Sequence, residues 1–402
     1  MYKPVNTHFE LQQEWRNQFV QWYAAGMPAF TQPIVEPYKR LHVNFKTKED
    51  RIHFGEKFGY KLTEKTPYIH FPDRPREVKQ TSKWEDDIYS ETRYPIYIIS
   101  KGRWESRHTS KALERLGIPY YIVVEPQEYN MYCQHIDSAK VLTLPFSNHG
   151  KGSGPARNWC WEHSIANGHA RHWLMDDNIA NFGRLHNNKL YVIEKGAAMW
   201  CAVEDFVDRY ENVALAGPHY EFFVVDSCAY QPFILNSRLM SCILIDNSFP
   251  ERWRGKFNED VDLSIRVLKE GWTTMLFYAF YQAKLATGTV KGGNTSEVYN
   301  DYQDDAAYNK SRMLKEMHPD CITLVERYGR VHHHVDLNAI VNKHNGQPAR
   351  QNALILKKDV PIVNRTDNYG MRLLRNHRTE TEYADPDFEN SVFPTGRTSI
   401  HA

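Results

Sequence analysis

The alternation of apolar runs with helix-like segments between Tyr94 and Asn178 constrains the fold of this chain more than any other feature of its sequence. Strands joined through helices by short links form a parallel sheet, and such sheets bind ligands in a crevice at the carboxyl ends of their strands. We therefore predict an α/β domain with a ligand site in that crevice. The predicted strands are Ile96–Ile99, Tyr120–Val124, Val141–Leu144 and His172–Met175, and the helices between them are Thr109–Leu116 and Ala156–Ala166.

The rest of the chain adds a smaller unit on each side of this domain. Residues 1–90 carry the patterns of a small αβ module, and residues 91–340 hold the α/β domain. Residues 341–402 form a basic extension with a polar tail, in which the segment 341–378 holds eight Lys or Arg against two Asp. We expect a Rossmann-like sheet, mixed and mostly parallel, that is flanked by helices.

The composition excludes several classes of protein. Of 402 residues, 41% are hydrophobic and 25% are charged, which suits a globular core and excludes wholesale disorder. A net charge of +1 excludes a histone-like polycation, so affinity for nucleic acid has to come from local basic patches. The six cysteines form no Cys-x-x-Cys pair, and no apolar run approaches the roughly 18 residues that span a bilayer. We expect a soluble cytoplasmic protein.

Two carboxylates and an amide, Asp176, Asp177 and Asn178, directly follow a predicted buried strand. Their hard oxygens are the ligands that Mg²⁺ or Mn²⁺ prefers when it bridges a diphosphate. The alternative is that one Asp caps the next helix, because short acidic turns are common after strands.

A second acidic group, Glu259 and Asp260, stands at the start of a helix predicted over Asp260–Glu270. Either residue can act as a general base that takes a proton from an acceptor hydroxyl. A purely structural function is the alternative, since the helix dipole favours negative charge at this end.

Basic and polar residues accompany these carboxylates. Arg157 and Asn158 begin a helix after a glycine-rich loop, where a guanidinium and backbone N–H groups can grip phosphate or sugar. An exposed first-turn Arg is the alternative. The residues at strand ends that can hold the base and ribose of a nucleotide are Ser100, Lys101, Arg103 and Glu125.

Two later segments complete the candidate site. The glycine-rich segment around Lys291, Gly292 and Gly293 suits a mobile loop that closes over a ligand. The run 332–334 contains three histidines, and in a strand neighbouring side chains point to opposite faces, so they cannot all face one ion. We expect one of them, His333, to complete the metal shell or to contact a pyrophosphate; a polar surface strand is the alternative.

Taken in order, these motifs resemble the GT-A glycosyltransferases. More narrowly, 98–103, 123–126 and 175–179 resemble the phage nucleobase glycosyltransferases associated with the TET/JBP hydroxylases, over about residues 94–336. The resemblance implies a transfer of sugar from a nucleotide-sugar, here a UDP-sugar, to the hydroxyl of a hydroxymethylated pyrimidine in DNA such as 5-hydroxymethylcytosine. It implies a metal motif at Asp176 and Asn178, where the neutral Asn178 departs from the family's pattern, and a base at Asp260 of an inverting enzyme.

This mechanism makes further demands on the chain. The metal and Arg157 would neutralise the leaving diphosphate. The target base would be flipped out or single-stranded, and Trp104, Tyr220 or Phe222 could stack on it. The N-terminal module and the basic segment 341–378 are the candidates for contacts with the DNA backbone. The alternatives are a transferase with a polysaccharide, protein or small-molecule acceptor, a nucleotidyltransferase, and a non-catalytic module that binds nucleic acid.

Overall fold

The computed structural model describes residues 27–28, 30, 43–63, 83–86, 91–224, 232–285, 291–293, 306–327, 329–341, 354–358 and 369–374. Within the predicted N-terminal module it describes one helix, α2 (Lys48–Lys57), which begins with a capping box between Thr47 and Asp50. The other elements predicted for that module lie wholly or partly outside the described residues. No helix in these ranges has the length and apolar composition that a membrane crossing requires.

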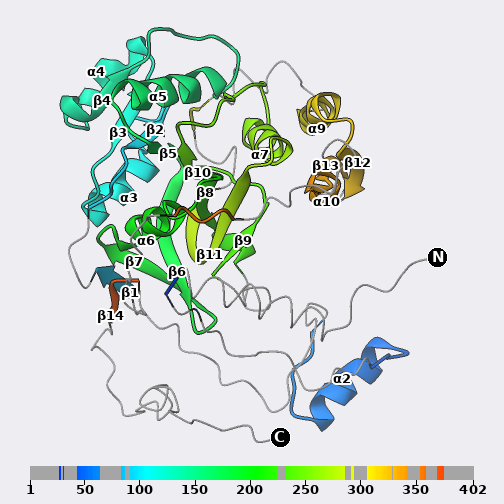
Figure 1. Cartoon of the computed structure of the whole chain (residues 1–402). Helices are drawn as coiled ribbons and strands as arrows, with labels where there is room; N and C mark the ends of the chain where they lie inside the picture. Colours follow the sequence, from blue (N-terminus) through cyan, green and yellow to red (C-terminus); the bar gives the residue numbers. More distant parts are fainter. Residues whose placement is uncertain are drawn as a thin grey trace, which may run out of the picture.

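The fold is built on one large mixed sheet flanked by helices (Figure 1). Its strands run in the order β14-β1-β7-β6-β11-β8-β10-β5-β2-β3-β4, and β9 pairs with β11. The strands are β1 (Lys83–Asp86), β2 (Ile96–Ile99), β3 (Tyr121–Val124), β4 (Val141–Thr143), β5 (Arg171–Asp176), β6 (Ile179–His186), β7 (Lys189–Lys195), β8 (Val213–Tyr220), β9 (Phe233–Leu235), β10 (Cys242–Asp246), β11 (Thr273–Lys284) and β14 (Met371–Leu374). The predicted α/β class is confirmed.

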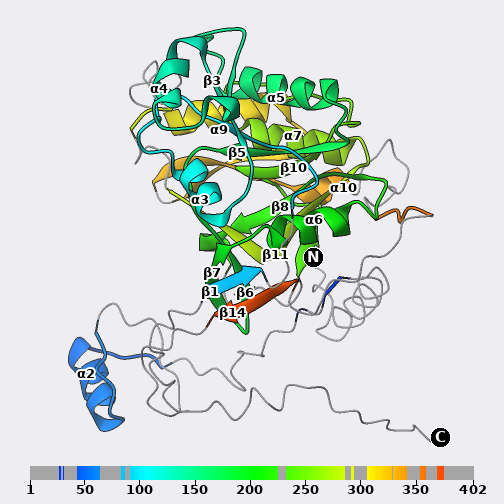
Figure 2. The same ribbon diagram turned by 90° about the vertical axis from the view of Figure 1, so that its left-hand side faces the viewer.

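Helices pack on both faces of this sheet (Figure 2). Ile96 and Ile98 of β2 point to the face covered by α3 and α6, whereas Tyr97 points to the face covered by α5 and α7. Both faces of the strand are therefore buried, which explains its uninterrupted apolar sequence. The helices are α3 (His108–Leu116), α4 (Tyr129–Cys133), α5 (Gly154–Ala166), α6 (Ala198–Val207), α7 (Glu259–Lys269), α9 (Ala306–Met317) and α10 (Leu337–Val341).

Strand direction brings several strand ends to one edge of the sheet. β4, β3, β2 and β5 are parallel, and β10 is antiparallel to both β5 and β8. Because β11 is parallel to β8, it runs in the same direction as β5. The carboxyl ends of β2, β3, β5, β8 and β11 therefore reach the same edge, which is where the crevice was predicted.

Strands from both flanking regions join the sheet, which departs from the predicted division of the chain. β1 lies before residue 91 and pairs in parallel with β7, and β14 from the predicted extension pairs with β1 (Figure 2). The Arg184 guanidinium lies 3.8 Å from the centre of the Trp84 ring. Asp86 accepts the backbone N–H groups of Ala197 and Ala198 at 2.8 and 3.0 Å. A short strand thus needs tertiary partners that a local sequence pattern does not reveal.

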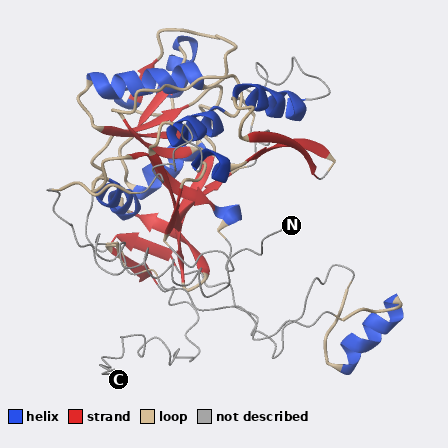
Figure 3. Cartoon of the chain, turned by 45° about the vertical axis from the view of Figure 1, so that its right-hand side comes forward, coloured by secondary structure: helices blue, strands red, loops and turns tan. Residues whose placement is uncertain are grey.

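The strands β12 (Ile322–Arg327) and β13 (Arg330–Val335) form a separate two-stranded sheet. Figure 3 shows this pair of red strands beside α9, apart from the large sheet. The arrangement brings His333 of the histidine run into the lining of the crevice.

Gly183 of β6 is expected to tolerate no side chain. A Cβ atom there would lie 2.1 Å from Cζ of the buried Tyr281 and 2.3 Å from the carbonyl oxygen of Tyr191. We expect Gly183→Ala to lower the free energy of unfolding by about 3 kcal/mol, as measured by urea denaturation. Gly154→Ala is the matched control, since its Cβ would meet only Gly255 O at 3.6 Å. Equal stability of the two variants would contradict the pairing of β6 with β11.

Candidate active site

A cleft of about 500 Å³ lies at the shared edge of the sheet, against the starts of α5 and α7. Three residues predicted for the site, Asn158, Lys291 and Gly292, do not line it. The predicted residues that do line it are Ser100, Lys101, Arg103, Glu125, Arg157, Asp176, Asp177, Asn178, Glu259, Asp260, Gly293 and His333.

Asp176 at the end of β5 lies between two cations. Its Oδ1 accepts a hydrogen bond from Arg157 Nη2 at 2.6 Å, and its Oδ2 accepts one from Lys284 Nζ and one from Ser241 Oγ, each at 2.7 Å. Burial alone would raise the pKa of Asp176, but the charges of Lys284 and Arg157 outweigh burial and hold the pKa below its ordinary value. Asp176 is therefore a charged carboxylate with both oxygens already bonded.

Lys284 is a site residue that the sequence analysis missed. Strand β11 extends as far as Lys284, because its last residues pair with β6. Burial would lower the pKa of Lys284, but Asp176 raises it above its ordinary value, so the ammonium group stays charged. The feature that could have identified Lys284 is the direction of β11. This strand runs parallel to β8, so its carboxyl end reaches the crevice.

Asp177 faces the other side of the strand end. Its Oδ2 accepts a hydrogen bond from Ser100 Oγ at 2.7 Å, and its Oδ1 forms an ion pair with Arg103. Burial raises the pKa of Asp177, although Arg103 opposes the shift. Thr109 at the start of α3 fixes this turn, since its hydroxyl donates to the carbonyl oxygen of Asp176 at 2.6 Å.

The carboxylate oxygens expected to hold a divalent metal, those of Asp176 and Asp177, already have protein partners. Both carboxylates are bonded as just described, and the amide nitrogen of Asn178 donates to the carbonyl oxygen of Leu285 at 3.2 Å. A metal ion would have to displace buried cations from these oxygens, so the observed arrangement does not fit one. Metal assistance through Asp176, Asp177, Asn178 and His333 stays a prediction from the sequence.

The ends of β2 and β3 are joined by an ion pair. Lys101 Nζ lies 3.0 Å from Glu125 Oε1, and the same oxygen accepts the backbone N–H of Asn148 at 3.1 Å. Gln127 donates to the other carboxylate oxygen at 2.6 Å. This places a fixed charge pair at the strand ends, where a nucleoside is held in parallel sheets.

The loop at residues 291–293 contacts the strand-end segment. The backbone N–H of Gly293 donates to the carbonyl oxygen of Lys101 at 2.7 Å, and Arg103 Nη2 donates to Gly292 O at 3.3 Å. A Cβ atom on Gly292 would lie 2.3 Å from the carbonyl oxygen of Gly102, so only glycine permits this approach. Lys291 contributes its carbonyl oxygen to Arg103 Nε at 3.4 Å.

The first turn of α5 supplies a buried guanidinium. Arg157 is 3% exposed, lies 4.8 Å from the centre of the Trp253 ring and places Nε 3.3 Å from Glu259 Oε1. Ser153 donates a hydrogen bond to the same oxygen of Glu259. The prediction that Asn158 binds the ligand is not supported by its contacts, because its amide exchanges hydrogen bonds with the backbone of Trp253 at 2.8 and 2.9 Å.

Asp260 differs from the other carboxylates in the cleft. Among the described residues, its carboxylate contacts no Lys or Arg, and it accepts only the backbone N–H of Val261 at 2.8 Å. Burial, and then the charge of Glu259, raise the pKa of Asp260 to about 6, although Arg157 opposes the shift. Glu259 is tied to Arg157 and Ser153, so Asp260 is the carboxylate available to take a proton.

The histidine run alternates as expected. His333 lines the cleft from β13, while His332 and His334 are exposed. Burial, reinforced by Arg238, lowers the pKa of His333 to about 4. A neutral imidazole therefore faces the cleft near pH 7.

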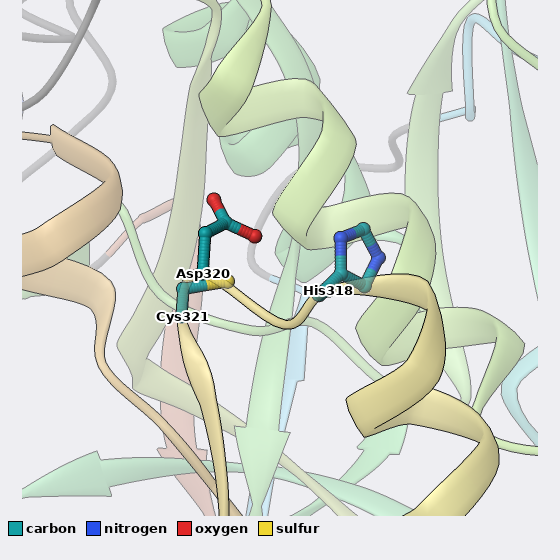
Figure 4. A group of neighbouring side chains, drawn as sticks. All are labelled: His318, Asp320 and Cys321. Atoms are coloured by element: carbon teal, nitrogen blue, oxygen red, sulfur yellow. The ribbon is translucent and has the colours of Figure 1, made fainter.

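A group outside the cleft is the one place in the described ranges where three possible metal-binding side chains gather: His318, Asp320 and Cys321 (Figure 4). Lys269 Nζ lies 2.8 Å from Asp320 and 3.2 Å from Nδ1 of His318, whose Nε2 faces Asp262 at 2.8 Å. Both ring nitrogens already have partners and one is a cation, so we assign these residues to the contact between α7 and the end of α9.

Aromatic residues follow the carboxyl end of β8. Tyr220 lines the cleft, Phe222 is 83% exposed, and the Phe223 ring lies 6.3 Å from the Tyr220 ring. Trp104 is different, because it is partly buried and packs against Tyr132 at 6.2 Å. Of the three rings predicted to stack on a base, Tyr220 lines the cleft and Phe222 is exposed two residues later in the chain.

Comparison with known proteins identifies one family. Residues 94–293 match the family model described as TET-Associated Glycosyltransferase. No curated protein matches the chain. The matched segment begins just before β2 and includes Asp176, Asp260 and Lys284, whereas His333 lies beyond it. As a member of the TET-associated glycosyltransferase family through residues 94–293, this chain is a glycosyltransferase.

Proposed function

We propose that this glycosyltransferase moves a sugar from a UDP-sugar to the hydroxyl of 5-hydroxymethylcytosine, or of a related hydroxymethylated pyrimidine, in phage DNA. The observation that carries the proposal is the presence, in one cleft, of paired cations beside a carboxylate, that of Asp260, which contacts no Lys or Arg among the described residues. Cations suit a leaving diphosphate, and a carboxylate with a raised pKa suits the removal of a proton from an acceptor hydroxyl.

The donor would bind with its nucleoside at the ends of β2 and β3 and its diphosphate toward Arg157 and Lys284. The ion pair between Lys101 and Glu125 offers both donors and acceptors to a base and ribose. The contacts of residues 291–293 with Lys101 and Arg103 would cover this end of the cleft.

The acceptor hydroxyl would be activated by Asp260. As its oxygen attacks the anomeric carbon, the proton passes to the Asp260 carboxylate, and the bond from that carbon to the diphosphate oxygen breaks. The bonding electron pair leaves with the nucleoside diphosphate. Attack opposite the leaving group inverts the anomeric configuration in a single displacement, for which one base is sufficient.

A DNA acceptor is supported by the family resemblance and by the aromatic residues at the end of β8. A base inside a duplex cannot enter a crevice of this kind, so it would be flipped out or single-stranded. Tyr220, Phe222 and Phe223 offer ring faces on which such a base can stack.

Contacts with the DNA backbone stay predictions. Of the eight cations in the segment 341–378, the described residues include Lys357, Lys358 and Arg372. Arg372 is paired with Glu85 at 2.5 Å across β14 and β1, so part of its charge is used within the sheet. The DNA contacts predicted for residues 1–90 are likewise a matter for footprinting at different salt concentrations.

The test is the intact mass of short oligonucleotides that contain 5-hydroxymethylcytosine or plain cytosine, after incubation with the full chain and a panel of UDP-sugars. We expect a hexose or pentose mass gain on the hydroxymethylated strand alone. Release of UDP without a gain on either strand would contradict the DNA acceptor and favour a polysaccharide, protein or small-molecule acceptor. Binding of the DNA without turnover of any donor would favour the non-catalytic alternative.

A further inference from the structure

We infer that Lys284 and Arg157 together bind and neutralise the diphosphate of the donor, in the place where a divalent metal ion was predicted. This inference rests on the proposed nucleotide-sugar donor and names the groups that hold its charged part.

The first support is the geometry around Asp176. Arg157 and Lys284 approach different oxygens of this one carboxylate, at 2.6 and 2.7 Å, and both cations line the cleft. Lys284 is held in place by a second contact with Ser241 Oγ at 2.7 Å. A carboxylate that orients two cations toward a cleft is a positioning group for those cations, and its oxygens already accept hydrogen bonds from Arg157, Lys284 and Ser241.

The second support is the charge of the cleft lining. Among the described residues that line it, seven Lys or Arg face five Asp or Glu, an excess of two positive charges. The diphosphate of a nucleotide-sugar carries two negative charges, so the lining already balances it. The cations are Lys101, Arg103, Arg157, Arg238, Lys256, Lys284 and Lys310, and the anions are Glu125, Asp176, Asp177, Glu259 and Asp260.

The third support is the consequence of placing an ion at Asp176. The ion would displace Lys284 and Arg157 from their carboxylate and leave two largely buried cations beside an added double positive charge, which is strongly unfavourable. Arg157 also has a buried Nη1 with no hydrogen-bond partner among the described residues. Its donors are therefore not all used by the protein.

These cations can take part in the reaction without a proton transfer of their own. When the bond between the anomeric carbon and the diphosphate breaks, its electron pair goes to the leaving phosphate oxygen. Lys284 and Arg157 remain protonated and stabilise the new negative charge through hydrogen bonds. The proton of the acceptor hydroxyl goes to Asp260, so atoms and charges balance.

The test is calorimetric binding of UDP and GDP to the full chain, in EDTA and in Mn²⁺. For whichever nucleotide binds wild type more tightly, we expect the Kd in EDTA and the Kd in Mn²⁺ to agree within about twofold. Lys284→Met should weaken binding about 10- to 100-fold, as expected for loss of a hydrogen bond to a charged group, and Lys284→Arg should restore most of it. Lys83→Met is the matched control, since the Lys83 side chain is 47% exposed and pairs with Glu194 outside the cleft.

The outcomes separate this inference from the proposed function. Binding that requires Mn²⁺ overturns the inference and leaves the transferase activity standing. Binding in EDTA without transfer to any oligonucleotide supports the inference and overturns the acceptor. If neither nucleotide binds in either buffer, the result contradicts both the proposed nucleotide-sugar donor and this inference. If Lys284→Met melts below wild type, the comparison of EDTA with Mn²⁺ on wild type decides the question.

Discussion

Asp260→Asn is expected to lower kcat for sugar transfer by about 10³-fold, within the range typical of a lost general base, with little change in UDP binding. The amide has the size of the carboxylate but cannot take the acceptor proton. The side chain contacts no Lys or Arg in the described ranges, so its replacement leaves the cations of the cleft in place. Initial rates and UDP calorimetry on wild type and variant measure the two effects separately.

The pH profile provides an independent measurement of the same group. The pKa of Asp260 is raised to about 6, and a base works only when it is deprotonated. We therefore expect kcat/KM of wild type to fall about tenfold per pH unit below pH 6 and to be level above it. In Asp260→Asn this step in the profile should be absent.

The same substitution should stabilise the fold. A carboxyl group whose pKa is higher in the folded state than in the unfolded chain makes folding less favourable as pH rises between those two values, and the penalty is complete at pH 7. Asp260→Asn removes it, so we expect the free energy of unfolding to rise by about 1–3 kcal/mol at pH 7 and to be unchanged below pH 4.

Glu259→Gln is the comparison for Asp260→Asn. Glu259 contacts Ser153 and Arg157, and its amide can keep the first contact, so we expect a smaller loss of about tenfold in kcat/KM. A larger loss in Glu259→Gln than in Asp260→Asn would make Glu259 the base. A destabilised Asp260→Asn would show that its carboxylate has a stabilising partner.

The elements around the crevice could be predicted because each has a local cause. Ile96–Ile99 is apolar on both faces, and its predicted bounds are those of β2. The helix predicted over Asp260–Glu270 is found at Glu259–Lys269, with the acidic first turn that the sequence indicated. Apolar periodicity and helix caps act within a few residues, so a single sequence contains them.

Elements that depend on distant partners could not be predicted in the same way. The end of β11 is set by pairing of Lys284 with Ile179, which is more than a hundred residues earlier in the chain. The hairpin of β6 and β7 turns at Asn187 and Asn188, both with positive φ, so this turn does have a local signal in the sequence. The strands from the flanking regions are fixed only by their neighbours in the sheet.

The candidate site shows the same division. Most side chains that line the cleft could be predicted from their positions at strand ends and helix starts, because the topology of the sheet brings these positions together. The sequence could not show which carboxylate is paired with cations and which is not, because Asp176 and Asp260 are both acidic residues at the ends of elements. The ion pairs with Arg157 and Lys284 make that distinction.

Arg157→Met is expected to lower the free energy of unfolding by about 3–5 kcal/mol and to abolish measurable UDP binding. The guanidinium is buried between Asp176 and Glu259, with contacts of 2.6 and 3.3 Å, and it lies over the Trp253 ring. Methionine can fill part of the volume, but it leaves Glu259 in the cleft without an ion-pair partner among the described residues. Urea denaturation gives the stability, and calorimetry at a temperature where the variant is folded gives the binding.

Two further variants distinguish charge from geometry at this position. Arg157→Lys keeps the charge but loses the planar fork that reaches both carboxylates, so it should recover stability in part and UDP binding weakly. Arg312→Met removes a guanidinium from an exposed pair with Glu316 at 3.6 Å, and its effect should stay below about 0.5 kcal/mol. If Arg157→Met were as stable as Arg312→Met, the carboxylates would not depend on this cation. Binding of UDP by such a variant at wild-type strength would then move the diphosphate to the other cations of the cleft.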